Sequence, residues 1–182
     1  SPTLGEKALD VMILAGIVAF IIISIFMIAY YRLPGVIAVI ALVLQVAGIL
    51  LSMSLPQITL TLPGIAGIIL SIGMGVDANV ITAERIKEEL RSGKTLIGAL
   101  QNGFEKAFSA IFDGNVTVVI LAVLLMIFGS GTMLSFGYSL IAGVVMNFLA
   151  GVLATRVMIL SVSRFGGIFK NTFLYGDRRA AK

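Results

Sequence analysis

Long apolar runs, separated by short polar stretches, make up most of the chain. Each run approaches the roughly 20 residues that an α-helix needs to cross about 30 Å of hydrocarbon. The apolar residues follow one another without the strict alternation that marks the strands of a membrane β-barrel. The pattern predicts an all-α, polytopic membrane helix bundle of about five spans, at residues 11–30, 36–55, 60–83, 108–128 and 136–162.

The longest connection between spans, residues 84–106, is polar and rich in charge. Its second half spaces Leu96, Leu100 and Phe104 four residues apart, which would align them on one face of a helix. Two interpretations remain open: a solvated connector helix, or an amphipathic helix whose apolar stripe lies on the membrane interface. The other connections are short and contain turn residues: Arg32-Leu33-Pro34-Gly35, Ser54-Leu55-Pro56-Gln57 and Gly129-Ser130-Gly131-Thr132.

Composition agrees with a chain that is surrounded by lipid. Apolar residues make up 59% of the chain and charged residues only 12%, with a mean hydropathy of +1.10. A soluble domain has about 45–50% apolar and about 25% charged residues. The chain has neither Cys nor His, which excludes disulfides, thiol catalysis and Cys/His metal sites. No nucleophile with a base, phosphate-binding loop or metal cluster is recognisable, so we expect no enzyme, no metal and no organic cofactor.

The Lys and Arg residues fall in alternate connections between the spans, so they would lie on one side of the membrane. The net charge of +4 raises the question of nucleic-acid binding, but the cations lie beside the spans in the positive-inside pattern. The opposite loops, residues 53–61 and 129–135, carry no charge. We expect a cell-membrane protein with an external N-terminus, a cytoplasmic C-terminus and 84–106 segment, and no nucleic-acid partner. The cations on the cytoplasmic side are Arg32, those of residues 85–106, and Arg164, Lys170, Arg178, Arg179 and Lys182.

Three ionisable residues lie inside the predicted spans: Asp77, Asp113 and Arg156. Counting residues to the nearest cytoplasmic charge puts each about 10–12 Å inside the membrane boundary, in one layer where they could pair. For Arg156 the alternative is a side chain that reaches to the headgroups, and for Asp113 a helix cap. An acid at membrane depth is costly and can exchange a proton, so Asp77 is the first candidate for a functional residue. The supporting polar set comprises Asn79, Asp113, Asn115, Thr117 and Arg156.

Small and polar residues repeat along two of the spans. They occupy every fourth position from Gly67 to Asn79 in the third span and from Gly143 to Thr155 in the fifth. Such stripes let helix backbones approach closely. Asp77 lies about 200° around the helix from this stripe, so the third span would be constrained on two faces and belong in the middle of the bundle. The glycines expected to mediate packing are Gly67, Gly73, Gly75, Gly143 and Gly151.

Several motifs occur together along the chain. Around the candidate acid the sequence runs Gly73-Met74-Gly75-Val76-Asp77-Ala78-Asn79-Val80, followed by Glu84-Arg85-Ile86 and Glu88-Glu89-Leu90-Arg91. The others are Ser1-Pro2-Thr3-Leu4-Gly5, Tyr30-Tyr31-Arg32-Leu33-Pro34-Gly35, Leu62-Pro63-Gly64-Ile65-Ala66-Gly67, Asp113-Gly114-Asn115-Val116-Thr117 and Thr155-Arg156. With these motifs the chain resembles, over nearly its whole length, the SecD family of the bacterial Sec protein-export machinery. One departure is Gly114, where an Ala often stands in that family, and Ile81-Thr82-Ala83 is unusual at the helix exit.

The resemblance implies both a fold and a role. Residues 1–182 would be the C-terminal membrane domain of a SecD-like subunit, with the fold of half a resistance-nodulation-division (RND) transporter membrane domain. An odd number of spans with an external N-terminus independently predicts an earlier span and an external domain before residue 1. The family assists preprotein translocation with the proton-motive force, so protons are the implied coupling ion and Asp77 their relay. The implied partners are SecF as the second half of the bundle, the SecYEG translocon, YajC, the translocating preprotein and membrane lipid.

Two other functions remain open. A proton-driven efflux or lipid transporter of the same superfamily would share the fold. Such exporters carry adjacent acids on this helix, whereas Asp77 is followed here by Ala78 and Asn79. A non-transporting membrane scaffold would use the polar layer only to hold helices together, and it would tolerate a neutral residue at position 77 as long as the complex assembles.

Overall fold

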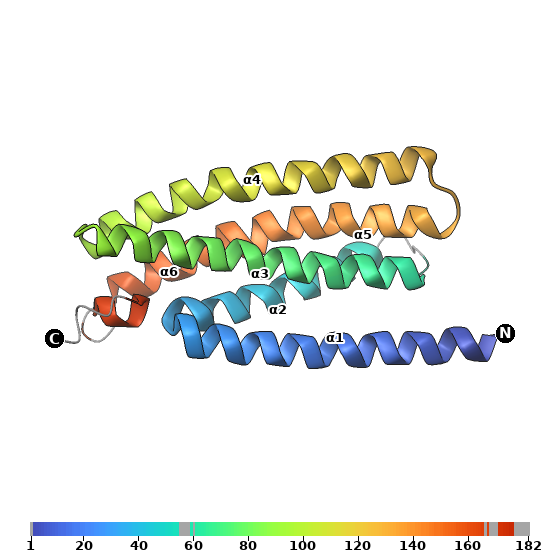
Figure 1. Ribbon diagram of the computed structural model, residues 1–182, viewed down its shortest axis with the longest axis horizontal. Helices are drawn as coiled ribbons and strands as arrows, with labels where there is room; N and C mark the ends of the chain where they lie inside the picture. Colours follow the sequence, from blue (N-terminus) through green and yellow to red (C-terminus); the bar gives the residue numbers. More distant parts are fainter. Residues whose placement is uncertain (1, 55–58, 60, 166, 168–170, 177–182) are drawn as a thin grey trace.

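The computed structural model is a set of long helices that lie side by side along one axis (Figure 1). It describes residues 2–54, 59, 61–165, 167 and 171–176. Within these residues five helical segments are long and apolar enough to cross a membrane, and no strand occurs, which confirms the predicted all-α class. The first four helices are α1 (Pro2–Tyr31), α2 (Leu33–Ser54), α3 (Leu62–Arg91) and α4 (Leu96–Phe128). The fifth helix is continuous but has three parts: α5 (Thr132–Met146), η1 (Asn147–Ala154) and α6 (Thr155–Arg164). The short 3₁₀ turn η3 (Thr172–Tyr175) follows it.

Each predicted span falls on one of these helical segments, but the helices are longer than the spans. α3 has 30 residues and α4 has 33. These lengths correspond to about 45 and about 50 Å, well beyond about 30 Å of hydrocarbon, so both helices project from the membrane. The predicted end of the second span at residue 55, the start of the third at residue 60, and the tail cations Lys170, Arg178, Arg179 and Lys182 lie outside the described residues.

The 84–106 segment is the closed end of a helical hairpin. α3 continues to Arg91, and α4 begins at Leu96 after a short turn. In this turn Gly93 has a φ of 86°, a conformation that glycine adopts without strain. Thr95 then caps α4, because its hydroxyl accepts a hydrogen bond from the Gly98 amide at 3.3 Å.

The apolar stripe of this hairpin faces the protein. Leu100 is fully buried and Phe104 nearly so, and both belong to one cluster with Ile86 and Leu90 of α3. Leu96 packs against the same cluster. The two sequence-based alternatives, a solvated connector helix and a helix on the membrane surface, are therefore both wrong. The reason is that α3 and α4 leave the membrane together, so each buries the apolar side of the other.

α3 lies in the middle of the bundle, in contact with α1, α2, α4 and α5 (Figure 1). Its small-residue stripe packs on the fifth helix at very short range. A Cβ atom on Gly143 would stand 1.9 Å from Oγ of Ser71, and one on Gly67 would stand 1.9 Å from Oγ of Ser139. Without a side chain at these two positions the helix backbones can approach this closely, as the stripe predicted.

The other glycines of the predicted packing set differ among themselves. A Cβ on Gly75 would meet Gln45 of α2 at 2.1 Å, and one on Gly151 would meet Asn147 at 2.4 Å. Both glycines therefore lie in tight, buried contacts. Gly73 has no atom within 4 Å of the corresponding position. Its assignment to helix packing within this chain is wrong, because Gly73 lies on the outer face of α3, away from the stripe.

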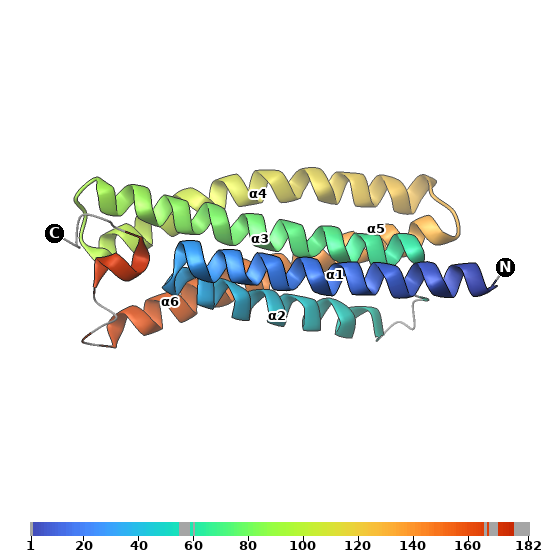
Figure 2. The same ribbon diagram turned by 60° about the horizontal axis from the view of Figure 1, so that its bottom comes forward.

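α1 lies at the edge of the bundle (Figure 1), against α2 and α3 (Figure 2). Its apolar side chains are exposed on most sides; Val11, Leu14 and Ile25 are each more than 60% exposed. An apolar surface of this extent would associate or aggregate in water, whereas lipid tails cover it in a membrane. The exposed side chains thus agree with the helix lengths: the chain is a multi-pass membrane protein.

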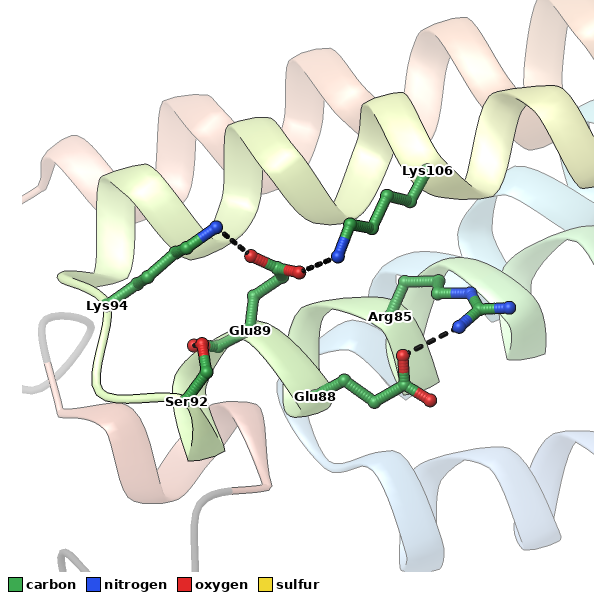
Figure 3. A network of polar contacts seen from close by, with 6 residues as sticks. All are labelled: Arg85, Glu88, Glu89, Ser92, Lys94 and Lys106. Carbon is green, nitrogen blue, oxygen red and sulfur yellow. Dashed lines mark hydrogen bonds and ion pairs between the residues drawn. The ribbon is translucent and has the colours of Figure 1, made fainter.

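A buried carboxylate, that of Glu89, links α3 to α4 at the end of the bundle where the α3–α4 turn lies. Glu89, beyond the apolar part of α3, lies between Lys94 and Lys106 (Figure 3). Nζ of Lys106 lies 2.6 Å from Oε1 of Glu89, and Lys94 donates to Oε2. These hydrogen bonds, from Lys106 above all, hold the pKa of Glu89 below its ordinary value. The neighbouring pair of Arg85 and Glu88 is exposed and contributes little.

The described part of the C-terminal tail packs on this same end. Nη1 of Arg32 donates a 2.7 Å hydrogen bond to the Phe173 carbonyl, and the guanidinium stacks 3.8 Å from the centre of the Phe173 ring. Tyr175 is only 1% exposed and joins the cluster around Leu100. The turn η3 therefore connects the α1–α2 elbow with the α3–α4 hairpin.

We expect Gly143→Ala to lower the melting temperature of the complete protein. The added methyl group would collide with Ser71, and overpacking of this kind costs about 1–3 kcal/mol. Gly16→Ala on α1 is the matched control, because its added methyl group would meet only the Ile69 side chain, at an ordinary contact distance of 3.7 Å. It should leave the melting temperature unchanged or raise it, since Ala is favoured over Gly in a helix by about 0.5–1 kcal/mol. Thermal unfolding followed by circular dichroism measures both; equal melting temperatures would contradict the close contact.

Glu89→Gln should destabilise the protein at neutral pH, because Lys94 and Lys106 lose their counter-charge. The pKa of Glu89 is lower in the folded than in the unfolded chain. Its stabilising effect is therefore complete above the unfolded value of about 4.3 and is lost as the pH falls through the folded value. The stability difference between wild type and Glu89→Gln should shrink below about pH 4. Glu88→Gln, in an exposed pair, is the control; equal effects of both variants at pH 7 would refute the role of Glu89.

Candidate functional site

Asp77 lies on the face of α3 opposite the buried stripe. Gly75 and Asn79, two residues away on either side, are buried, whereas Asp77 is exposed. Thr61 starts the helix by accepting a hydrogen bond from the Gly64 amide at 3.2 Å, and α3 then runs without a break past the acid. The expectation that the acid points away from the packing stripe is therefore met.

The carboxylate lines a hollow of about 240 Å³ between α3 and α4. Small residues on both helices create the space, above all Ala78, Ala110 and Gly114. Gly114 has no atom within 4 Å of the position that a Cβ would take, so the hollow is open toward the outside of the bundle. We call it the Asp77 pocket; the residues that line it are Met74, Asp77, Ala78, Ile81, Ala110, Ile111, Gly114, Asn115 and Val118.

Asn115 forms the inner wall of the Asp77 pocket and links it to the fifth helix. Its amide nitrogen donates to the Ile111 carbonyl at 2.7 Å, which leaves its oxygen facing inward. That oxygen accepts a 3.3 Å hydrogen bond from Nδ2 of Asn147. Asn147, fully buried, was expected only as part of a packing stripe. Its spacing of four residues from Gly143 and Gly151 was the available signal, but that spacing does not reveal a bond to α4.

Two further amides join α3 to its neighbours. Oδ1 of Asn79 accepts a 3.0 Å hydrogen bond from the Thr155 hydroxyl, and its nitrogen donates to the Gly75 carbonyl at 2.8 Å. Gln45 of α2 donates to the Ser71 carbonyl at 2.8 Å. Buried side-chain hydrogen bonds between membrane helices each contribute about 0.6 kcal/mol on average. The amides therefore hold three helices around α3 in register.

The fifth helix changes its winding at the level of these amides. η1 is a π-helix of eight residues that begins at Asn147 and is followed directly by Thr155. π-helical segments are rare, occur mostly as single turns, and are frequent at functional sites. Here the segment allows Asn147 to reach Asn115 and Thr155 to reach Asn79. Nothing in the sequence pattern predicted it, because the repeat of small residues is regular through this region.

Asp113 and Thr117 lie on the exposed side of α4. The Thr117 hydroxyl lies 3.5 Å from the Asp113 carbonyl, one turn earlier. The alternative of Asp113 as a helix cap is wrong, because α4 begins at Leu96, and Asp113 lies in the helix interior. Asp113 does not line the Asp77 pocket, although its neighbour Gly114 does.

The structure does not bring the Arg156 side chain into contact with the two acids. Its guanidinium is 6.0 Å from the centre of the Phe104 ring, and Phe104 precedes Asp113 by nine residues on α4. Nine residues correspond to about 13 Å along the helix. The Arg156 guanidinium therefore lies nearer the charged end of the bundle than Asp113 does, although its neighbour Thr155 is bonded to Asn79, two residues from Asp77. Within the described residues no hydrogen bond or ion pair joins Asp77, Asp113 and Arg156.

The Asp77 pocket offers one carboxylate, one amide and an open side. No group of three or more His, Cys, Asp or Glu side chains lies close enough to hold a metal ion in the described part of the chain. A charged Asp at the centre of a membrane helix costs about 2.5–3.5 kcal/mol. That cost is removed when the carboxylate binds a proton or when a cation faces it from another helix. The geometry is therefore suited to proton exchange or to pairing across an interface.

Comparison with known proteins matches nearly the whole chain to one family. The family profile described as "Protein export membrane protein SecD/SecF, C-terminal" matches residues 1–164. The chain is 44% identical over 160 residues to protein translocase subunit SecD of Synechocystis sp., which covers 88% of this chain and 34% of that protein. It is 46% identical over 157 residues to SecD of Leptotrichia buccalis (86% and 39%) and 45% identical over 155 residues to protein translocase subunit SecDF of Bacillus subtilis (85% and 21%).

The chain thus spans between 21% and 39% of the length of these relatives. The profile match includes all five membrane helices and the Asp77 pocket. On these grounds the chain belongs to the SecD family of protein-export membrane proteins, of which it represents the C-terminal membrane domain.

Proposed function

We propose that this chain is the membrane domain of a Sec translocase subunit in which Asp77 binds and releases a proton, so that the proton-motive force assists preprotein translocation. The translocase role is supported by the relatives, which are named as subunits of a protein translocase. The proton role is supported by one observation above all. Asp77 lies on the outer face of α3 and lines a hollow between α3 and α4. It has no ion-pair partner among the described residues.

The proposal follows from the cost of charge in a membrane. An acid on a helix face that lipid or a partner helix covers is more stable in its neutral form unless a cation faces it. A cation that approaches in one conformation and withdraws in another would therefore unload and reload the proton. Moving one charge across 100 mV is worth about 2.3 kcal/mol. That energy is sufficient to shift an equilibrium between conformations that differ by a few kcal/mol.

The facing cation would belong to a second membrane half. The surface around Asp77 is formed by small residues, and Gly73 and Gly114 have no neighbour within 4 Å of a Cβ position. Such a surface allows another helix to approach closely. We propose SecF as this half, which completes an RND-like bundle. SecYEG, YajC and the preprotein are the proposed partners of the complete protein, and the charged end with Arg32 and the α3–α4 turn is proposed to face the cytoplasm.

Two hydrogen bonds would transmit a change at Asp77 to the fifth helix. Asn115 in the pocket wall accepts from Asn147, and Asn79 accepts from Thr155. The two bonds lie at either end of η1, a π-helical segment of a kind that is frequent at functional sites. A shift of α3 against α4 on protonation would change both bonds. The fifth helix would then carry the movement to the charged end of the bundle.

Two alternatives predict different behaviour. An efflux or lipid transporter would share the fold and the acid, but the curated relatives reported above are named as translocase subunits. A scaffold would need Asp77 only for helix association. The scaffold and the proton-exchange site differ in one respect: only the latter loses function when the side chain keeps its shape but cannot ionise.

Asp77→Asn should reduce the gradient-dependent part of preprotein translocation to background in vesicles that contain the complete complex. The substitution keeps the size of the side chain and removes the exchangeable proton. Asp10→Asn, the same change on the exposed surface of α1, is the control and should leave translocation unchanged. Complex assembly is measured by co-purification of SecF. Full gradient-dependent translocation by Asp77→Asn, with the complex intact, would refute the proposal and favour the scaffold.

A further inference from the structure

A second hollow, of about 350 Å³, lies between α4 and the fifth helix near the charged end of the bundle. Gln101, Phe104, Glu105 and Phe108 line it from α4, and Val152 and Arg156 from the fifth helix. It shares no residue with the Asp77 pocket. We call it the Arg156 pocket.

The Arg156 pocket lies at the membrane boundary. Counting the roughly 20 residues that cross the hydrocarbon back along α4 from Phe128 reaches Phe108. Glu105 therefore lies about 5 Å outside the hydrocarbon, at the level of the lipid headgroups. Arg156 lies at the same level, because its guanidinium stacks at 6.0 Å on the ring of Phe104, the residue before Glu105. This depth agrees with the sequence-based alternative in which the Arg156 side chain reaches the headgroups.

The pocket changes from charged to apolar along the membrane normal. Arg156 and Glu105 are both exposed, and neither takes part in an ion pair within the described part of the chain. Toward the membrane centre the walls become Phe108 and Val152. Phe148 continues this apolar surface, with its ring centre 6.0 Å from that of Phe108. A ligand that fits must therefore be charged at one end and apolar at the other.

We propose that the Arg156 pocket binds one phospholipid that carries a primary ammonium in its headgroup. The Arg156 guanidinium would hold the phosphate, since its planar fork of N–H donors matches phosphate oxygens. The Glu105 carboxylate would accept hydrogen bonds from the ammonium, and the Gln101 amide adds a further polar contact. One acyl chain would lie on Phe108, Val152 and Phe148. The inference rests on the membrane location of the bundle and is independent of proton exchange at Asp77.

The headgroup chemistry makes the proposal selective. A primary ammonium donates hydrogen bonds to a carboxylate, whereas the quaternary ammonium of phosphatidylcholine has no N–H to donate. An anionic headgroup without an amine, such as that of phosphatidylglycerol, leaves Glu105 unpaired and close to negative charge. Phosphatidylethanolamine should therefore bind more tightly than either. The two residues have separable effects: Arg156 determines affinity for the phosphate that all three lipids share, and Glu105 determines the preference among headgroups.

Native mass spectrometry of the complete complex in mild detergent, titrated with the three lipids, tests the proposal. Wild type should bind one phosphatidylethanolamine more tightly than it binds phosphatidylcholine or phosphatidylglycerol. Arg156→Gln should weaken binding of all three by about tenfold, the effect of losing one charge-assisted hydrogen bond. Glu105→Gln should retain phosphatidylcholine binding and remove the preference for phosphatidylethanolamine. Arg164→Gln, an exposed cation in the last turn of α6, is the control and should change nothing.

Three results would overturn the proposal. Equal lipid binding by wild type and Arg156→Gln would mean that lipid attaches elsewhere. The same loss in Arg164→Gln would mean that only the total charge matters. A photoreactive residue at position 152 that crosslinks to a protein of the complex, and not to phospholipid, would mean that a helix of a partner fills the pocket.

Discussion

The contact between the small-residue stripe of α3 and the fifth helix determines how the rest of the molecule is arranged. Because Gly67 and Gly143 lack side chains, the two helices pack at a distance that no larger residue permits. α3 is thereby held in the centre, and Asp77, on its opposite side, points out between α3 and α4. The position of Asp77 is thus a consequence of glycines on the opposite face of α3, such as Gly67, which lies more than two helical turns away.

The polar groups of the bundle fall into three environments with different consequences. Asn147 and Asn79 are buried and hydrogen-bonded, and they fix helix positions. Asp77 lies in an open hollow on a membrane-spanning helix, without an ion-pair partner among the described residues, where a charge is costly. Arg156 lies nearer the charged end of the bundle, beside the Phe104 ring, where a long cationic side chain can extend toward water. Burial and depth, more than residue type, therefore separate the roles that these side chains can have.

Much of the fold could be predicted from sequence because a membrane imposes simple lengths and periods. The five spans follow from runs of about 20 apolar residues, and the packing face of α3 from a repeat of four that begins at Gly67. The 84–106 hairpin was missed because the stripe of Leu100 and Phe104 looks the same whether it faces lipid, water or protein. The expected pairing of Arg156 with the acids was not found, because a residue count along each helix does not give the direction in which a side chain points. The winding of η1 depends on tertiary contacts that no local pattern records.

The proposed function depends on proton exchange at Asp77 in the assembled complex. Infrared difference spectroscopy of the complex in vesicles, recorded with and without a proton gradient, tests it most directly, because a protonated carboxyl group has a C=O band that the carboxylate lacks. If Asp77 exchanges the proton, a band that changes with the gradient is present in wild type and missing in Asp77→Asn. A gradient-dependent carboxyl band that persists unchanged in Asp77→Asn, or no such band in wild type, would contradict it.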